Sequence, residues 1–151
     1  MSNVQTTAGT TFAVVSGIPA TYDSAGFAAL TWVSVGEVTN MGDIGPEFTL
    51  VTYDAIGNRI TKKLKGQVDM GSQSIEVGRD GTDAGQVILK AAVTIGSASE
   101  DSVHSFRVTY KDASIEYYTG LPMSYSTSLG DANQVTSASI AIELDNTIVE
   151  A

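Results

Sequence analysis

The stretch QVTSASIAIELD, residues 134–145, alternates between apolar and small or polar residues over most of its length. Successive side chains of an extended chain point to opposite faces, so a period of two predicts a strand that is buried on one face. The face expected to be buried carries Ala138, Ile140, Ile142 and Leu144. The opposite face carries Ser137, Ser139, Ala141 and Glu143. This strand therefore indicates a sheet packed against a hydrophobic core.

The first part of that stretch, VTSASIAI at residues 135–142, contains neither a charged residue nor a proline. Native sheets usually protect an exposed edge strand with charge or proline. We therefore expect this strand to be paired or covered. In an assembly it would join the sheet of a neighbouring subunit and so help to close a barrel.

The segments before this strand are also mostly strand-like, because they are rich in β-branched and aromatic residues and are interrupted by glycine and proline. Further strands are expected within residues 10–17, 32–40, 67–78, 104–110 and 114–126. Residues 1–9 are small and polar and are expected to form a flexible arm. The chain is therefore expected to be a single domain, 1–151, of mainly β (α+β) class: a β-sandwich or barrel flanked by one α-helix.

That helix is expected in DAGQVILKAAVTIG, residues 83–96. Asp83 is a suitable N-cap with Gln86 three residues later, and Gly96 is a suitable C-terminal stop. Apolar residues recur at helical spacing. They are Ala84, Val87, Ile88, Ala91 and Ile95.

The stretch FTLVTYDAIGNRITKKLKG, residues 48–66, has the pattern of a hairpin, because Gly57-Asn58 is a tight-turn dipeptide between alternating segments. With that turn, one face carries Val51, Tyr53, Ala55, Ile60, Lys62 and Leu64. The other face carries Thr52, Asp54, Thr61, Lys63 and Lys65. A lone two-stranded hairpin is marginal in water, so the apolar face is expected to lie against its own domain or another molecule.

Positive charge is concentrated in the same hairpin. The chain has seventeen acidic and eight basic residues, and four of the basic ones are Arg59, Lys62, Lys63 and Lys65. The net charge of −9 disfavours general nucleic-acid binding, which needs cationic surface to displace counterions. Opposite charges on two surfaces of one protein favour head-to-tail contacts between copies, and such contacts propagate into rings and filaments.

No residue pattern predicts an active site, a metal site or a cofactor site. The chain has no cysteine, which excludes disulfides, thiolate zinc sites and a cysteine nucleophile. The one histidine, His104, shares a strand face with Phe106 and Val108 and is expected to be packed. DGTDAGQ, residues 80–86, lacks the acidic twelfth position of a calcium loop. We therefore expect a protein that is not an enzyme, and the absence of a long apolar run predicts no membrane-spanning helix.

Three stretches carry a resemblance to a known family: GEVTNMGDIGPEFTLVTYD (36–54), DMGSQSIEVGRDGTDAGQ (69–86) and YYTGLPMSYSTSLGDANQVTSASIAIELD (117–145). With the order of elements along the chain, they resemble the major tail tube protein of long-tailed bacteriophages with non-contractile tails, and of related gene transfer agents. The resemblance implies a β-sandwich flanked by a helix, similar to the tube protein of type VI secretion. It also implies hexameric rings that stack into a hollow tube.

The resemblance implies roles for particular segments. In the family, the long segment between the second and third strands is mobile in the free subunit and orders against neighbouring subunits; here it is residues 41–66. The expected inter-subunit contacts are Val51, Tyr53, Arg59, Ile60, Lys62, Lys63, Leu64 and Lys65. DNA slides more freely past an anionic or neutral wall than past a cationic one. The candidates for lining the lumen are therefore Glu76, Ser137, Ser139 and Glu143.

The partners that the resemblance implies are further copies of the chain, the tail terminator, the tape measure protein and distal tail proteins. Viral DNA would pass through the lumen without specific binding, in a virion assembled in the bacterial cytoplasm. Two other functions remain open: a related baseplate or distal component that forms a single ring, and a monomeric β-sandwich that binds carbohydrate or another ligand. The basic hairpin could also be a surface loop without a role in assembly, and the lumen candidates could face solvent outside a tube.

Overall fold

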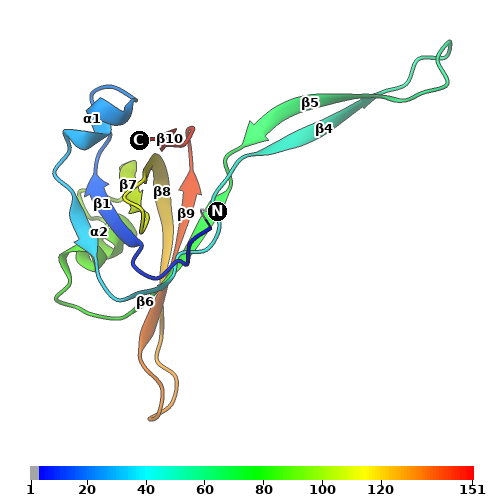
Figure 1. Cartoon of the computed structure of the whole chain (residues 1–151). Coiled ribbons are helices and arrows are strands. Elements are labelled where there is room, and N and C mark those ends of the chain that lie inside the picture. The colour runs from blue at the N-terminus through cyan, green and yellow to red at the C-terminus, as the bar shows by residue number, and fades with distance from the viewer. Residues whose placement is uncertain (1–3) are drawn as a thin grey trace.

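The structure is a computed structural model that describes residues 4–151. Within these residues, ten strands and two helices follow one another. Their bounds are β1 Thr11–Ser16, α1 Ser24–Ala28, β2 Val33–Val35, β3 Val38–Asn40, β4 Glu47–Tyr53, β5 Lys62–Asp69, β6 Ser72–Gly78, α2 Ala84–Ala92, β7 His104–Thr109, β8 Ile115–Ser128, β9 Ser137–Leu144 and β10 Val149–Glu150. Most of the strands curve around a core and form the body of the molecule, and β4 and β5 extend away from that body (Figure 1). The expected mainly β class is confirmed.

The body is one eight-stranded antiparallel sheet in the order β2-β1-β7-β8-β9-β6-β3, with β10 added beside β8. The strand β8 is long enough to pair with β7 through its first half and with β9 through its second half. The free edges of this path are β2 and β3, each three residues long, and edges so short are poor templates for unwanted pairing.

The strand β9 lies between β6 and β8, so both of its edges are paired within the chain. The expectation that it is paired is therefore confirmed, but the expectation that it joins a neighbour's sheet is wrong. An uncharged strand without proline needs no protection when it is central in its own sheet.

The core is formed by the facing sides of the curved sheet together with one side of α2. The expected buried face of β9 is confirmed, with Ile140 and Ile142 fully buried, and so is the burial of Ile75 and Val77 on either side of Glu76. The buried residues of the core cluster are Phe12, Val14, Val35, Ile75, Val77, Leu89, Phe106, Val108, Tyr118, Ala138, Ile140, Ile142 and Leu144. One polar link crosses this core, where the Tyr118 hydroxyl donates to Gln73 Oε1.

The helix α2 begins as expected, because the Asp83 side chain accepts a hydrogen bond from the backbone of Gln86 at 3.0 Å. Its expected apolar face is confirmed only at Ile88, which packs against the core, and the expected stop at Gly96 is wrong because the helix ends at Ala92. Val87 is half exposed, and Ile95 lies beyond the end of the helix and is 91% exposed. The side chain of Gln86 is buried instead. Its burial is tolerated because Nε2 donates hydrogen bonds to the carbonyls of Gly36 and Gly78 at 3.1 and 3.0 Å. This amide ties the helix to the sheet.

The short helix α1 covers part of the sheet's outer face. Phe27 is fully buried on this helix and stacks on Tyr117 of β8, with 5.1 Å between the ring centroids. Trp32 stacks on the same tyrosine and donates through its indole nitrogen to the Phe27 carbonyl at 2.9 Å. The outer face of the sheet is therefore covered around Tyr117.

The strands β4 and β5 form a separate two-stranded sheet, called the hairpin below. Val51 pairs with Leu64 and Tyr53 with Lys62, which confirms that these residues share a face. The expected two-residue turn at Gly57-Asn58 is wrong. The strands stop at Tyr53 and Lys62, and residues 54–61 form a longer loop closed by a 3.0 Å hydrogen bond from Asn58 N to Ala55 O. Ala55 and Ile60 therefore belong to this loop and not to the strands.

Two glycines lie where the hairpin joins the body. Gly45 precedes β4 and Gly71 follows β5, and both have positive φ, +155° and +85°. A Cβ at Gly71 would lie 3.1 Å from the Gly45 carbonyl oxygen, so the two connecting segments pass close together. We call this crossing the hairpin root.

The expected N-terminal arm, residues 1–9, falls partly outside the described residues, which begin at Val4. Residues 4–9 are exposed and lie in neither a helix nor a strand.

Candidate subunit interface

The hairpin exposes apolar side chains on both of its faces. All seven residues of β4 are exposed, and on one face Leu64 remains 57% exposed. Alternation along β4 puts Phe48 and Leu50 on the other face, where Leu50 pairs with Lys65. Sequence reasoning had treated that face as the charged one. The exposed large apolar residues of the hairpin and its loop are Phe48, Leu50, Val51, Tyr53, Ile56, Ile60, Leu64 and Val68. Exposed apolar surface of this kind is typical of sites that contact other molecules, and a contact role for the hairpin stays a prediction.

The lysines of the hairpin have no carboxylate opposite them in the ladder. Lys62 faces Tyr53, Lys63 faces Thr52 and Lys65 faces Leu50. The amine of Lys65 lies 4.7 Å from the centre of the Phe48 ring, a cation–π contact. The positive charge is therefore presented beside apolar surface and is not neutralised across the ladder.

The proposed lumen residues come together on one face of the body. Glu76 of β6 pairs directly with Ser139 of β9, and Ser72 pairs with Glu143. Because opposite residues of an antiparallel pair lie on the same side, all of these side chains lie on the face turned away from the core. The structure thus places the four candidates together, and their role in lining a channel stays a prediction.

Sequence reasoning missed half of this face. The second half of β8 adds three serines to it, since Ser124, Ser126 and Ser128 pair with Ala141, Ser139 and Ser137. The resulting surface across β6, β9 and β8 consists mainly of serine side chains and two glutamates, and Leu121 lies at its end, opposite Glu143. Its members are Ser72, Ser74, Glu76, Ser124, Ser126, Ser128, Ser137, Ser139, Ala141 and Glu143. We call it the serine face; the signal in the sequence was serine at alternate positions in SQS and SYSTS.

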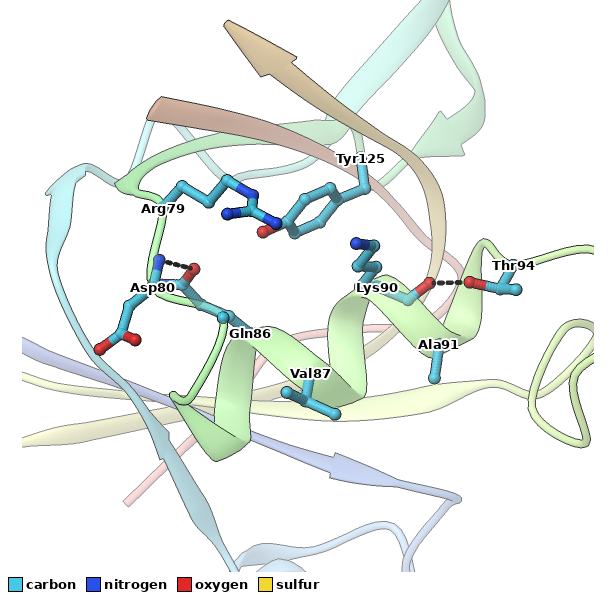
Figure 2. A pocket seen from close by; sticks show the side chains of 9 residues that line it. Arg79, Asp80, Gln86, Val87, Lys90, Ala91, Thr94 and Tyr125 are labelled. Carbon is cyan, nitrogen blue, oxygen red and sulfur yellow. Dashed lines mark hydrogen bonds between the residues drawn. The ribbon is translucent and has the colours of Figure 1, made fainter. Parts of the chain in front are cut away.

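A shallow pocket of about 340 Å³ lies beside α2, and Figure 2 shows its lining. Arg79 and Lys90 extend toward the Tyr125 ring, while the Asp80 carboxylate points away from it. The Thr94 hydroxyl donates to the Lys90 carbonyl at 2.8 Å, so its hydrogen is already engaged. None of the lining residues is a histidine, a cysteine or a serine.

The histidine is packed in the body, as expected. His104 is fully buried, its Nδ1 lies 2.9 Å from the Ser102 carbonyl, and its Nε2 has no hydrogen-bond partner among the described residues. Burial lowers the pKa of His104 below its usual 6.5. The hydroxyl of the adjacent Ser105 donates to the Gly17 carbonyl at 2.7 Å and is not available to the imidazole.

Within residues 4–151, no group of three or more histidine, cysteine, aspartate or glutamate side chains could hold a metal ion. In the same part of the chain, no helix is both long and apolar enough to cross a membrane.

No protein-family model matches this chain, and no curated protein matches it. Solved structures do match. A chain of the anti-feeding prophage baseplate, determined by cryo-electron microscopy with six-fold symmetry, is similar over 100% of this chain and 97% of its own, with a TM-score of 0.72 and 12% identity. The cap that terminates the tube of the same prophage matches 93% of this chain and 88% of its own, with a TM-score of 0.56 and 18% identity.

A third similar structure is the tail of an empty gene transfer agent particle, refined with C6 symmetry. The match covers 81% of this chain and 87% of that chain, with a TM-score of 0.59 and 13% identity. At these identities the likeness shows the fold. This chain has the fold found in components of phage-like tails, which include contractile injection systems as well as a gene transfer agent.

Proposed function

We propose that this protein is a structural subunit of a phage-like tail, and that it polymerises as stacked hexameric rings into a hollow tube. The observation that carries the proposal is the hairpin, whose apolar and basic surface is left uncovered by the rest of the chain. A surface that is not self-complementary, on a body of opposite charge, builds open or ring-shaped assemblies in preference to closed dimers. The shared fold with six-fold symmetric tail structures supports the hexamer.

Charge supports the same assembly. Residues 55–66 contain four basic residues and no acidic one, which leaves seventeen acidic and four basic residues for the rest of the chain. Each subunit can therefore present a positive ribbon to a negative body on the next. The expected contacts remain Val51, Tyr53, Arg59, Ile60, Lys62, Lys63, Leu64 and Lys65. Phe48 and Leu50 join them on the evidence of their exposure.

The serine face is the proposed wall of the lumen. It carries two carboxylates and no basic side chain, so it would repel the phosphate backbone weakly and hold no DNA. In this assignment the tube forms in the bacterial cytoplasm and ends in the virion. The tail terminator, the tape measure protein and distal tail proteins would be its partners, together with further copies of the chain.

Electron microscopy of the concentrated protein, with light scattering on the same sample, tests the proposal. Stacked rings or rods are the expected result. Monodisperse monomers at all concentrations and salt conditions would contradict it, and would favour the monomeric ligand-binding sandwich.

The lumen assignment has its own test. Glu76→Lys with Glu143→Lys should leave tubes intact and reduce DNA delivery in an infectivity assay. Asp101→Lys with Asp131→Lys, at two exposed sites outside the serine face, is the matched control. Full infectivity of the Glu76 and Glu143 double variant would contradict the assignment.

A second candidate is a baseplate or terminator component that forms one ring and does not stack. The similarity to the baseplate chain, with its TM-score of 0.72, favours this candidate. Single rings in the micrographs, without rods at any concentration, would select it over the tube.

A further inference from the structure

A groove of about 550 Å³ lies between the hairpin and the body, beside the hairpin root. The floor of the groove is formed by residues that also pack against the buried core cluster. They are Ile44, Met70, Tyr110 and Ile148. Its other lining residues are Gly45, Pro46, Phe48, Val68, Glu116, Thr147 and Glu150. We call it the root groove. It combines an apolar floor with two carboxylates.

These carboxylates face each other. Ile115 and Ala151 exchange both backbone hydrogen bonds, at 3.2 and 2.9 Å, and Glu116 pairs with Glu150 at the next position. This neighbouring position is the non-hydrogen-bonded kind, in which side chains lie closest. Like charges directly opposite each other destabilise a sheet. The free chain therefore keeps an unfavourable pair at the groove, and a cation placed between the two glutamates would relieve it.

The pKa of the Tyr110 phenol is affected by the negative charge of the same two glutamates. Its pKa is raised to about 12, first by burial, then by its hydrogen bond to Glu116, and further by the negative charges of Glu116 and Glu150. Removal of its proton would add a third negative charge. The mouth of the groove is thus a concentrated negative site beside apolar surface.

Lys62 and Lys63 of the same chain lie far from this site. Phe48 and Val68 pair at the groove, whereas Tyr53 and Lys62 pair five residues further along β4. At about 3.3 Å per residue, that separation is about 17 Å along the ribbon. The hairpin also runs straight away from the body (Figure 1). Lys62 and Lys63 can therefore meet these glutamates only on another copy, whereas the amine of Lys65 lies on the Phe48 ring beside the groove of its own chain.

We propose that the root groove of one copy receives the hairpin of a second copy. Lys62 lies against Glu116 and Glu150, and the apolar hairpin face to which Lys62 belongs packs on the floor of the groove. That face carries Val51, Tyr53 and Leu64 beside Lys62. Charge and apolar character both match, and each copy offers one hairpin and one groove on different surfaces. The contact is therefore heterologous and can propagate. This inference rests on the proposed function, because it names the surface on which the hairpin assembles.

Charge exchange tests the pairing. Lys62→Glu with Lys63→Glu, and separately Glu116→Lys with Glu150→Lys, should each raise the protein concentration needed for assembly by about tenfold or more, because like charges then meet in every contact. A chain with all four substitutions should recover assembly. Asp101→Lys, at an exposed site away from the groove, is the control for Glu150→Lys and should assemble like the unaltered chain. Circular dichroism on each variant checks that the body is folded.

The results separate this inference from the proposed function. Failure of the unaltered chain to assemble would overturn both. If the hairpin variant is blocked while the groove variant assembles like Asp101→Lys, the proposed function stands and the groove is not the acceptor. Two blocked double variants without recovery in the fourfold variant would also overturn the pairing.

Glu150→Gln gives an independent readout, because the two states of the protein respond in opposite directions. Removing one of two facing charges should raise the thermal midpoint of the free monomer slightly and weaken assembly. A merely structural role for Glu150 would lower the midpoint or leave both properties unchanged, and either result would contradict the proposal.

Discussion

The β8–β9 pair and the β4–β5 pair are antiparallel ribbons built from the same alternation of apolar and polar residues, yet only one of them buries its apolar face. Along β9 every second residue is buried, from Ala138 to Leu144, whereas along β4 all residues are exposed. The two strands differ in what lies beside them. The β9 strand has β6 on its other side and the core beneath it, and β4 has only β5.

A two-stranded ribbon without a third strand or a packing surface is marginal in water. The hairpin therefore has an apolar face of the kind that is usually buried, but in the free chain this face is exposed. In our proposal the missing packing surface is another copy of the chain. The stability of the body and the stability of the assembly are then controlled by different ribbons, and substitutions should separate them.

The largest effect is expected in the body. Ile140→Ala should lower the free energy of unfolding by about 2–5 kcal/mol, because it leaves a cavity at a fully buried position. Leu64→Ala, which also shortens a large aliphatic side chain, should change the same quantity in the monomer by less than about 0.5 kcal/mol. Denaturant unfolding of both variants under monomeric conditions measures the difference. Similar losses in the two variants would show that the hairpin packs against its own body in solution.

The next effect concerns assembly alone. Lys62→Glu with Lys63→Glu should leave the thermal midpoint of the monomer unchanged and cost assembly several kcal/mol, on the order of the penalty for facing like charges. High salt should reduce the defect of this variant, since exposed charges are screened beyond about 8 Å at physiological ionic strength. Sedimentation at low and high salt measures both. Normal polymerisation at low salt would show that the charge of the hairpin has no part in assembly.

The smallest expected effect is the dependence of the free energy of unfolding on pH. It arises in the body, because the only histidine of the sequence, His104, is on β7. Burial depresses the folded-state pKa of His104 below its usual 6.5, so below about pH 6.5 the unfolded chain binds more protons than the folded one. The free energy of unfolding should therefore fall as the pH drops from about 6.5 toward 5. His104→Gln should flatten this slope. An equal slope in both proteins would assign it to other groups.

Local patterns in the sequence predicted the body well. The faces of β9 and β6 follow from alternation, and the start of α2 follows from the Asp83 cap, because each depends on residues close together in the chain. The buried face of α2 carries Gly85, Gln86, Leu89 and Ala92, and it was missed because glycine and polar Gln86 occupy its first turn. The Gln86 partners Gly36 and Gly78 are brought there by the fold, and hydrophobic spacing carries no information about them.

The candidate interface was predicted only in part. The basic, apolar hairpin was found from residues 48–66, but its loop was predicted to be shorter than it is. A Gly-Asn pair forms a two-residue turn only when both strands continue up to it, and here the strands stop earlier. The pairing of β9 on both sides, and the meeting of Glu116 with Glu150, depend on contacts between distant segments. Such contacts leave no local pattern, so the serine face and the root groove emerged only from the structure.

The two glycines at the hairpin root are the points about which the hairpin can rotate as a rigid arm relative to the body. Glycine tolerates a wide range of backbone angles, so small rotations at Gly45 and Gly71 cost little. From Phe48 to the loop at Gly57 the arm is about 30 Å long at 3.3 Å per residue. A turn of about 10° at these two glycines then moves the tip by about 5 Å, again on the basis of that strand length. In a curved tube, subunits on the inner and outer sides of the bend are spaced differently. In the tube that we propose, a hairpin of this reach would let every subunit keep the same contact with its neighbour while the tube bends.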